Sequence, residues 1–251
     1  MTLPVGRLPA EFDEWTFPGG GAVARRDVAP AVRQAIASDG TLYAWAARQP
    51  GHEAFTGRGA AYGVTLGDVR AVVRHAHRGG YVIAPLLGDR YAGRPRFFRE
   101  LEWSRSLSAA GVSTPAFLAG AWTAAGPFHR ADVATERVPG RDLAALFFQG
   151  DAPAAEERSA ILRAVGALVR RLHDAGAVHP DLQLKNVLVG GSPPGAWLLD
   201  VDSCRAATPA AHAGNLRRFY RSWGKWNRTG RGRLTAEDRR DFEAGYSEAA
   251  R

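Results

Sequence analysis

Residues 171–204 read RLHDAGAVHPDLQLKNVLVGGSPPGAWLLDVDSC and contain most of what this sequence tells us about its fold. The stretch starts at the end of an amphipathic helix, whose apolar residues recur at positions 161, 162, 165, 168, 169 and 172 and which Gly176 terminates. A loop with His179 and Asp181 follows, then an apolar run, a proline-containing turn and a second apolar run that ends at Asp200. This order predicts a helix, a loop and two short strands joined by a turn.

The residues before this stretch divide into segments with strand and helix patterns. Residues 55–74 alternate short β-branched runs with glycine turns and predict a hairpin around Gly67-Asp68. Residues 95–110 carry apolar side chains at helical spacing, and the runs AFLAGAW and ADVATERV predict two further strands. Residues 29–48 predict helical structure that is interrupted at residues 38–40, SDG.

Pro139-Gly140 separates the strand-rich part from the helical part and is the predicted boundary between two lobes. We therefore predict an α+β, bilobal fold. Residues 1–138 would form an N-terminal extension and a β-rich N-lobe, and residues 139–251 a short, α-rich C-lobe. A chain of 251 residues, 45% of them hydrophobic, is long enough to bury a substantial core.

The composition restricts the classes of protein without selecting one. The formal net charge is +8, and Lys185 and Lys225 are the only lysines among 33 basic residues. This charge is compatible with an anionic partner, although biased codon usage would also give a high arginine content. The one cysteine, Cys204, excludes an internal disulfide. No apolar run approaches the roughly 18 residues of a membrane span, and the first residues do not resemble a signal peptide, so we expect a cytoplasmic protein.

The polar residues of residues 171–204 resemble the catalytic half of the protein-kinase-like superfamily. In that pattern an aspartate precedes an asparagine by five residues, and a metal-binding aspartate follows a β-hairpin; Asp181, Asn186 and Asp200 match. The resemblance implies ATP-dependent phosphoryl transfer, in which Asp181 orients the attacking hydroxyl while Asn186 and Asp200 hold Mg²⁺ through hard oxygen ligands. Lys185 is a candidate for contact with the γ-phosphate or the substrate.

Each fragment of this pattern has an ordinary alternative. HPDL alone is a common turn, and LLDVD alone is a strand that ends in solvated acids, so only their order, spacing and position favour the kinase interpretation. Asp202 is a second metal ligand or, as we prefer, a carboxylate that supports the loop. His179 is assigned a structural role, and the other histidines lack the spacing of a zinc site.

The candidate nucleotide-binding residues of the N-lobe match the kinase pattern less closely. Gly57 and Gly59 belong to a glycine-rich turn whose backbone N–H groups can approach phosphates. Where a protein kinase has a phosphate-binding lysine on its third strand, this sequence has Arg74, and Glu100 on the following helix is its candidate partner. A surface arginine and a solvated glutamate are the alternative. Glu136, just before the lobe boundary, completes the candidate set.

Longer segments narrow the resemblance to one family. VRHAHRGG (residues 73–80), FFRELEW, GVSTPAF, TERVPGRDL and WLLDVDS together resemble the lipopolysaccharide kinase family of Gram-negative bacteria. The similarity runs over residues 55–225, and VRHxxRGG and LLDVD are its distinctive parts. It implies phosphorylation of a 3-deoxy-D-manno-octulosonic acid (Kdo) hydroxyl on a lipid A precursor, at the cytoplasmic face of the inner membrane.

Two basic segments are compatible with such an acceptor. Residues 70–99 carry seven arginines and one acid, and residues 214–233 carry seven basic residues and no acid. In the second segment Leu216, Phe219, Tyr220 and Trp223 recur at helical spacing between arginines, as in a helix that lies on a membrane surface. Core packing of these side chains, with the basic residues of Arg217–Arg228 merely solvated, is an equally good interpretation. The expected partners are a Kdo-containing glycolipid and, peripherally, an anionic membrane surface.

Three other functions fit parts of the sequence. An aminoglycoside-type phosphotransferase shares the three catalytic positions, but its acceptor site is expected to be acidic. A non-catalytic, pseudokinase-like binding module would explain the missing strand lysine but not the intact Asp181, Asn186 and Asp200. A nucleic-acid-binding protein would explain the charge alone, and the sequence contains no recognised nucleic-acid motif, so we expect no nucleic-acid partner. The sequence does not predict an oligomeric state.

Overall fold

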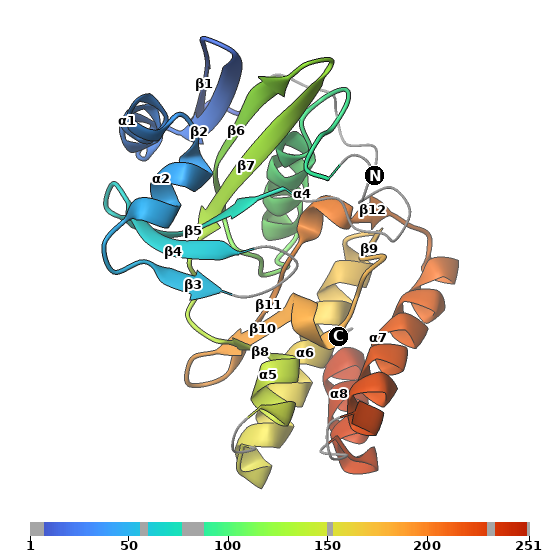
Figure 1. The fold of residues 1–251 in the computed structure, drawn as a ribbon. Helices are drawn as coiled ribbons and strands as arrows, with labels where there is room; N and C mark the ends of the chain where they lie inside the picture. Colours follow the sequence, from blue (N-terminus) through green and yellow to red (C-terminus); the bar gives the residue numbers. More distant parts are fainter. Residues whose placement is uncertain (1–7, 56–59, 77–87, 150–152, 230–233, 250–251) are drawn as a thin grey trace. The chain divides into compact units, whose positions relative to one another are not determined.

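The computed structural model describes residues 8–55, 60–76, 88–149, 153–229 and 234–249, and the chain divides into two compact units (Figure 1). The first unit comprises residues 4–102 and 116–137. The second comprises residues 1–3, 103–115 and 138–251. Helix α4 (Phe97–Ala109) therefore begins in the first unit and ends in the second.

An antiparallel seven-stranded sheet forms the first unit, with strand order β1-β2-β6-β7-β5-β4-β3. The strands are β1 (Phe12–Phe17), β2 (Gly20–Arg25), β3 (Glu53–Phe55), β4 (Ala61–Leu66), β5 (Val69–His75), β6 (Phe117–Ala125) and β7 (Phe128–Glu136). β4 and β5 form the predicted hairpin, and Gly67 takes the left-handed conformation (φ 63°) that its two-residue turn requires.

Helices cover both faces of this sheet. Successive strand residues point to opposite faces, and each face contributes buried side chains to a separate cluster. The helices are α1 (Ala29–Asp39), α2 (Leu42–Arg48) and the first turns of α4. Ala22 of β2 packs in the cluster that contains α1 and α2, whereas the next residue, Val23, packs with Phe97 of α4. A Cβ atom on Gly120 of β6 would lie 2.3 Å from the Phe97 ring, so this glycine lets α4 approach closely. The contact anchors the helix that carries Glu100.

The second unit is mainly helical. Besides the end of α4, its helices are α5 (Leu143–Phe148), α6 (Ala155–Asp174), α7 (Pro209–Thr229) and α8 (Ala236–Glu248), with 3-10 turns η1 (Leu184–Asn186) and η2 (Val201–Ser203). Its short strands are β8 (Arg141–Asp142), β9 (Ala177–Val178), β10 (Val187–Gly190), β11 (Gly195–Leu198) and β12 (Arg205–Ala206). β10 and β11 form a hairpin, so Asp181 lies before this hairpin and Asp200 after it.

Helix α6 is central to the core of the second unit. Its predicted apolar face is buried, with each of its members at most 2% exposed: Ile161, Leu162, Val165, Leu168, Val169 and Leu172. α6 also contacts α8 through a glycine on each helix. A Cβ atom on Gly166 would lie 2.1 Å from the carbonyl oxygen of Phe242, and one on Gly245 would lie 2.1 Å from that of Arg163. The two helices therefore approach each other backbone to backbone.

The predicted α+β architecture, with a β-rich part before a helical part, is confirmed. The predicted interruption of residues 29–48 is also present. Gly40 ends α1 with φ 77°, and Thr41 caps α2 by accepting a hydrogen bond from the N–H of Ala44 (3.0 Å). Strands β1 and β2 extend the sheet into the predicted N-terminal extension, in which no individual helix or strand was predicted before residue 29. In the part of the chain that the structure describes, every helix is too short or too polar to cross a membrane.

Candidate active site

Asp181 lies in a loop between β9 and η1, where neighbouring residues determine its position. Its backbone N–H donates to Nδ1 of His179 (3.1 Å), and its carbonyl accepts from Nδ2 of Asn186 (2.8 Å). Its side-chain Oδ2 accepts from Nε2 of Gln183 (2.9 Å), and the side chain is 34% exposed. The loop thus presents an oriented and accessible carboxylate, which can accept a hydrogen bond from a hydroxyl group.

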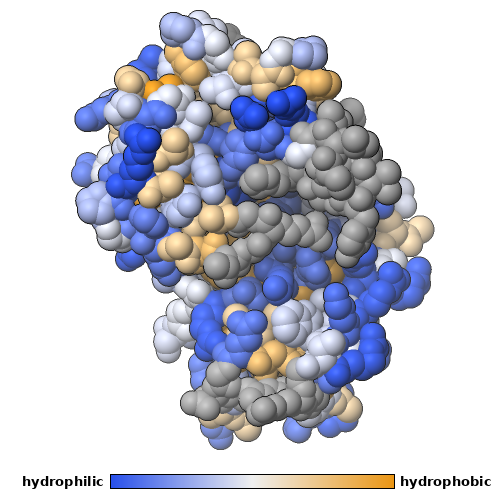
Figure 2. Space-filling view, viewed as in Figure 1, coloured by the Kyte–Doolittle hydropathy of each residue, from blue (hydrophilic) through white to orange (hydrophobic). Residues whose placement is uncertain are grey.

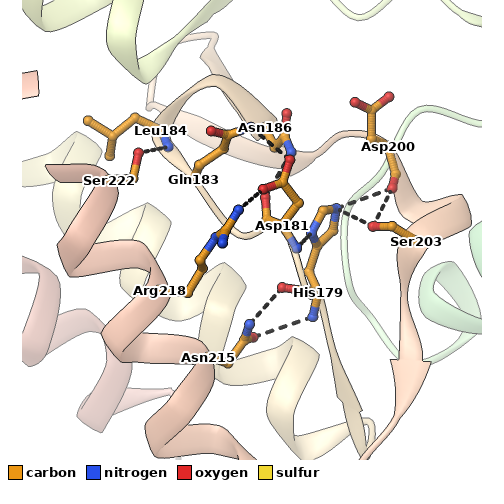
Figure 3. Close-up of polar contacts among 10 residues, drawn as sticks. All are labelled: His179, Asp181, Gln183, Leu184, Asn186, Asp200, Ser203, Asn215, Arg218 and Ser222. Carbon is orange, nitrogen blue, oxygen red and sulfur yellow. Dashed lines mark hydrogen bonds and ion pairs between the residues drawn. The ribbon is translucent and has the colours of Figure 1, made fainter. Parts of the chain in front are cut away.

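His179 joins the Asp181 loop to the segment that carries Asp200 (Figure 3). Its side chain is buried, and because Nδ1 accepts the N–H of Asp181, the ring proton is on Nε2. Nε2 lies 3.1 Å from the carbonyl oxygen of Leu199 and 3.2 Å from that of Asp200, and it donates to both. Burial lowers the pKa of His179, so the ring is neutral near pH 7. These contacts are those of a structural residue.

Asp200 has an unusual backbone conformation that its neighbours hold in place. Its φ of 54° and ψ of 42° are left-handed, and among the described residues it is the only non-glycine with positive φ. Such a conformation costs about 1–2 kcal/mol, although aspartate tolerates it better than most residues. The Asp200 carbonyl accepts hydrogen bonds from His179, from the N–H of Ser203 (3.2 Å) and from its hydroxyl (3.1 Å). The residue itself is exposed.

The amide of Asn186 is oriented in a way that suits metal binding. Asn186 is 7% exposed, and its Nδ2 donates to the carbonyl of Asp181, which leaves Oδ1 as the free end of the amide. Within the described ranges, no donor contacts this oxygen. An amide oxygen and the Asp200 carboxylate are hard ligands of the kind that Mg²⁺ prefers.

These two residues fit Mg²⁺ if a nucleotide supplies further ligands. The described residues contain no group of three or more His, Cys, Asp or Glu side chains that could hold a metal ion. Mg²⁺ commonly uses only one or two protein groups together with water and substrate phosphates. Asp202, in η2, is half-buried and lies two residues after Asp200 in the chain.

Helix α7 supports the Asp181 loop at two points. Asn215 is 6% exposed; its Nδ2 donates to the carbonyl of His179 (2.7 Å), and its Oδ1 accepts from the His179 N–H (3.4 Å). Two turns further along, Oγ of Ser222 accepts from the N–H of Leu184 (3.2 Å). The beginning and the end of the loop are therefore attached to one helix (Figure 3).

A second buried histidine extends this network. Nε2 of His173, on α6, donates to Oδ1 of Asn215 (3.1 Å), and its Nδ1 accepts from the hydroxyl of Tyr246 on α8 (2.7 Å). The His173 ring also stacks on His212, with 4.2 Å between ring centroids. Burial is the main cause that lowers the pKa of His173 to about 4, so this ring is also neutral near pH 7. Hydrogen bonds thus connect α8, α6 and α7 with the Asp181 loop.

Arg218, on α7, contacts the carboxylate of Asp181. Its Nη2 donates to Oδ1 of Asp181, whereas Gln183 occupies Oδ2. The sequence pattern predicts that Arg218 is one of the solvated or lipid-facing basic residues of this segment, but in the structure it contacts the candidate catalytic residue. Lys185 is exposed, and its Nζ lies 5.5 Å from the centroid of the Trp226 ring.

The aromatic side chains of α7 belong to the core of the second unit. Phe219 and Trp223 are 0% and 7% exposed, and Leu216 and Tyr220 pack against the same cluster. The stripe was predicted either to face a membrane surface or to pack in the core, and these side chains pack in the core. The exposed side of α7 is basic, and hydrophilic residues gather over it in Figure 2. Its exposed basic residues, besides Arg218, are Arg217, Arg221, Lys225 and Arg228.

The candidate nucleotide-binding residues of the first unit include one close pair. Nη2 of Arg74, on β5, lies 2.5 Å from each carboxylate oxygen of Glu100, on α4. Their side chains are 28% and 5% exposed. Glu136 is exposed at the end of β7, where its N–H donates to a backbone carbonyl of residue 116 (2.8 Å). Gly57 and Gly59 lie outside the described residues.

Known proteins resemble this chain over most of its length. The model of the lipopolysaccharide kinase (Kdo/WaaP) family matches residues 44–246, which include every candidate site residue named above. The chain belongs to this family. The family that the motifs indicated is therefore confirmed, and a member of this kinase family is a phosphotransferase with an alcohol group as acceptor.

Three relatives illustrate the similarity to the Kdo/WaaP family. The chain is 32% identical over 176 residues to the 3-deoxy-D-manno-octulosonic acid kinase of Vibrio cholerae. The matched region covers 68% of this chain and 72% of that protein. It is 35% identical over 195 residues to the kinase of the same name from Xanthomonas oryzae pv. oryzae, covering 74% of each. The kinase of that name from Stenotrophomonas maltophilia is 34% identical over 189 residues, covering 72% of this chain and 71% of the relative.

Sequence reasoning missed several polar side chains that support the site. They are Gln183, Ser203, Asn215, Arg218 and Ser222. Those at positions 215, 218 and 222 share one face of α7, at spacings of three and four residues. This polar stripe, which lies beside the aromatic stripe, could have been detected in the sequence from its helical spacing. The spacing alone does not show that the stripe contacts a loop 36 to 38 residues earlier in the chain.

Proposed function

We propose that this chain transfers the γ-phosphoryl group of ATP to a hydroxyl of a Kdo sugar on a lipid A precursor, a step in the biosynthesis of the lipopolysaccharide core. The relatives are named as Kdo kinases, and the family is one of lipopolysaccharide kinases. One observation carries the proposal. The buried ring of His179 binds the backbone of Asp181 through Nδ1 and that of Asp200 through Nε2, so a single residue links the candidate base to the candidate metal ligand.

In the proposed reaction the residues of this chain position the reactants and stabilise charge. Asp181 accepts a hydrogen bond from the acceptor hydroxyl, orients its oxygen toward the γ-phosphorus and takes its proton as the new O–P bond forms. The bond to the β-phosphate oxygen breaks, and ADP leaves. Asn186 and Asp200 would hold Mg²⁺, which when bound supplies positive charge to the phosphates. Arg74, held by Glu100, would contribute the cation that a strand lysine supplies in protein kinases.

Transfer of labelled γ-phosphate tests this function. We expect label on a Kdo-bearing lipid A precursor and on free Kdo, and none on an aminoglycoside or a generic protein offered in parallel. Asp181→Asn should retain nucleotide binding but lose turnover by about 10²- to 10⁴-fold, because proton acceptance is lost. Arg240→Ala, which changes an exposed arginine of α8, is the matched control. Label on the aminoglycoside, or near-normal turnover by Asp181→Asn, would contradict the proposal.

Peripheral binding to the cytoplasmic face of the inner membrane is part of the same proposal. The support for it is the exposed basic side of α7, since each basic residue near anionic lipid contributes about 1 kcal/mol of attraction, which salt screens. The combined variant Arg217→Gln, Arg221→Gln and Arg228→Gln should sediment less with anionic vesicles. It should also have a higher KM for a lipid-linked acceptor. Unchanged sedimentation, or an equal loss of turnover on free Kdo, would contradict membrane binding through this helix.

A further inference from the structure

Arg218 contacts Asp181 although Asp181 is already held in place. The backbone of Asp181 is bound to His179 and Asn186, and its Oδ2 is bound to Gln183. The Arg218 side chain is 44% exposed, and Asp181 is its one polar partner in the described part of the chain. A guanidinium has five N–H donors in a planar fork, so most of the hydrogen-bonding capacity of Arg218 is unused by these residues.

This contact occupies an atom that the proposed reaction needs. Arg218 is bound to Oδ1 of Asp181 and Gln183 to Oδ2, whereas the acceptor hydroxyl must reach one of these two oxygens. Ion pairs that are this exposed contribute little to stability, so another anion can take Arg218 away from Asp181. The acceptor has to displace this contact or share it.

The acceptor of the proposed reaction supplies such an anion. Kdo is a sugar acid, and a carboxylate of this kind is ionised at neutral pH. Near Asp181 this carboxylate would meet a second carboxylate and the phosphates of ATP, so its binding requires a cation close to Asp181. Arg218 meets that requirement by direct contact, whereas Lys185 lies over the Trp226 ring. We propose that Arg218 binds the carboxylate of the acceptor sugar, and that this binding frees Oδ1 of Asp181 for the acceptor hydroxyl.

The position of Arg218 on α7 suits this role. Asn215, three residues earlier, and Ser222, four residues later, both attach α7 to the catalytic loop. The guanidinium therefore projects from a rigid element at a defined place beside the base. A guanidinium and a carboxylate can form two parallel N–H···O bonds, which would fix the orientation of the sugar as well as its charge. The inference rests on the proposed function and names the residue that selects a sugar acid.

Two acceptors that differ only in charge test the role of Arg218. They are the methyl glycoside of Kdo and the same glycoside with its carboxylate converted to a neutral carboxamide. For the unmodified chain we expect kcat/KM to favour the acid by about 10- to 100-fold, the usual effect of hydrogen bonds to a charged group. In Arg218→Gln and Arg218→Ala this ratio should fall to about 1, with the KM for ATP unchanged. Arg218→Lys should keep part of the preference, and the control Arg240→Ala should keep all of it.

Binding measurements separate this inference from the function on which it rests. Calorimetry with a non-hydrolysable ATP analogue should show tighter binding of the acid than of the carboxamide, and Arg218→Gln should abolish the difference. An unchanged preference for the acid in Arg218→Gln, or an equal loss on both acceptors, would overturn the assignment of Arg218 while leaving Kdo phosphorylation intact. Failure of the unmodified chain to phosphorylate the acid would overturn the proposed function itself.

Discussion

Arg74, which the sequence pattern aligns with the strand lysine of protein kinases, contacts Glu100 as predicted. The Glu100 side chain is 5% exposed, and Nη2 of Arg74 lies 2.5 Å from both of its carboxylate oxygens. A buried carboxylate that loses its counter-charge is strongly destabilising. The pair therefore couples the stability of the first unit to the cation that we propose for nucleotide binding.

A double-mutant cycle tests whether Arg74 and Glu100 act as a pair. Arg74→Ala should raise the KM for ATP and lower the free energy of unfolding by about 3 kcal/mol, because it breaks an ion pair of the largely buried Glu100 carboxylate. The double variant with Glu100→Ala should be less destabilised than the sum of the single changes. Arg70→Ala, an exposed position on the same strand, is the control for loss of charge. Additive effects on both quantities would show that the two residues work independently.

The residues within one motif were predictable from sequence, because spacing along a short loop determines which groups meet. Asp181 and Asn186 are five residues apart and share a hydrogen bond. Asn215 and Arg218 reach the same loop from α7, and their partners depend on tertiary packing that local patterns do not encode. Arg218 was assigned to a basic surface for this reason, since an exposed arginine at an active site and a solvated one look alike in a sequence.

Helix α7 also shows that a local sequence pattern can predict an element without predicting what the element contacts. Its periodicity predicted an amphipathic helix, and the helix is present over Pro209–Thr229. An aromatic stripe looks the same whether it faces a protein core or a lipid surface, so periodicity alone left both interpretations open. The strands β1 (FDEWTF) and β2 (GGAVAR) were missed because each is only six residues long and residues 1–28 contain no motif that identifies them.

The close packing of helices α6 and α8 can be tested by substituting a glycine at their contact. Alanine normally stabilises a helix relative to glycine, yet a Cβ atom on Gly166 would meet the Phe242 carbonyl oxygen at 2.1 Å. Gly166→Ala should therefore push the helices apart and lower the free energy of unfolding by about 1–3 kcal/mol. In Gly224→Ala on α7, the new Cβ would have Arg228 as its nearest neighbour at 3.6 Å, so stability should hold or rise slightly. Equal stability of the two variants in denaturant titrations would refute the close packing.

The molecule as a whole contains two histidines whose pKa values shift in opposite directions. In the first unit, burial opposes the charge of His75, but hydrogen bonds to Asp132 (2.6 Å) and Asp89 (3.2 Å) outweigh it and raise the pKa. His75 therefore stabilises that unit fully below the unfolded pKa of about 6.5, and the contribution is lost as pH rises through the folded pKa. In the second unit, His173 has its pKa lowered to about 4, so its contribution is present above about pH 6.5 and is lost as pH falls toward 4.

The contributions of His75 and His173 should accordingly be lost at opposite ends of the pH range, one in each unit. Acidification from pH 7 to 5 should cost the second unit about 2 kcal/mol through His173, whereas alkaline pH should weaken the first unit through His75. Hydrogen exchange read by mass spectrometry, corrected for the intrinsic pH dependence of exchange, can follow the units separately. His75→Gln should remove the alkaline trend alone, and His173→Gln should reduce the acid trend alone. An alkaline trend that persists in His75→Gln, or an acid trend that is unchanged in His173→Gln, would contradict these assignments.

The backbone contact between Gly166 and Gly245 also bears on how the chain matures during synthesis. Helix α6 ends at residue 174 and α8 begins at residue 236, so the ribosome makes 61 residues (235 − 174) between the two helices. At about 5–20 residues per second, this interval lasts roughly 3–12 seconds. Throughout it, the face of α6 around Gly166 lacks its partner, because α8 has not yet been translated. A chaperone that recognises newly made chains would find the second unit in this open form, and the unit can close only when translation reaches α8.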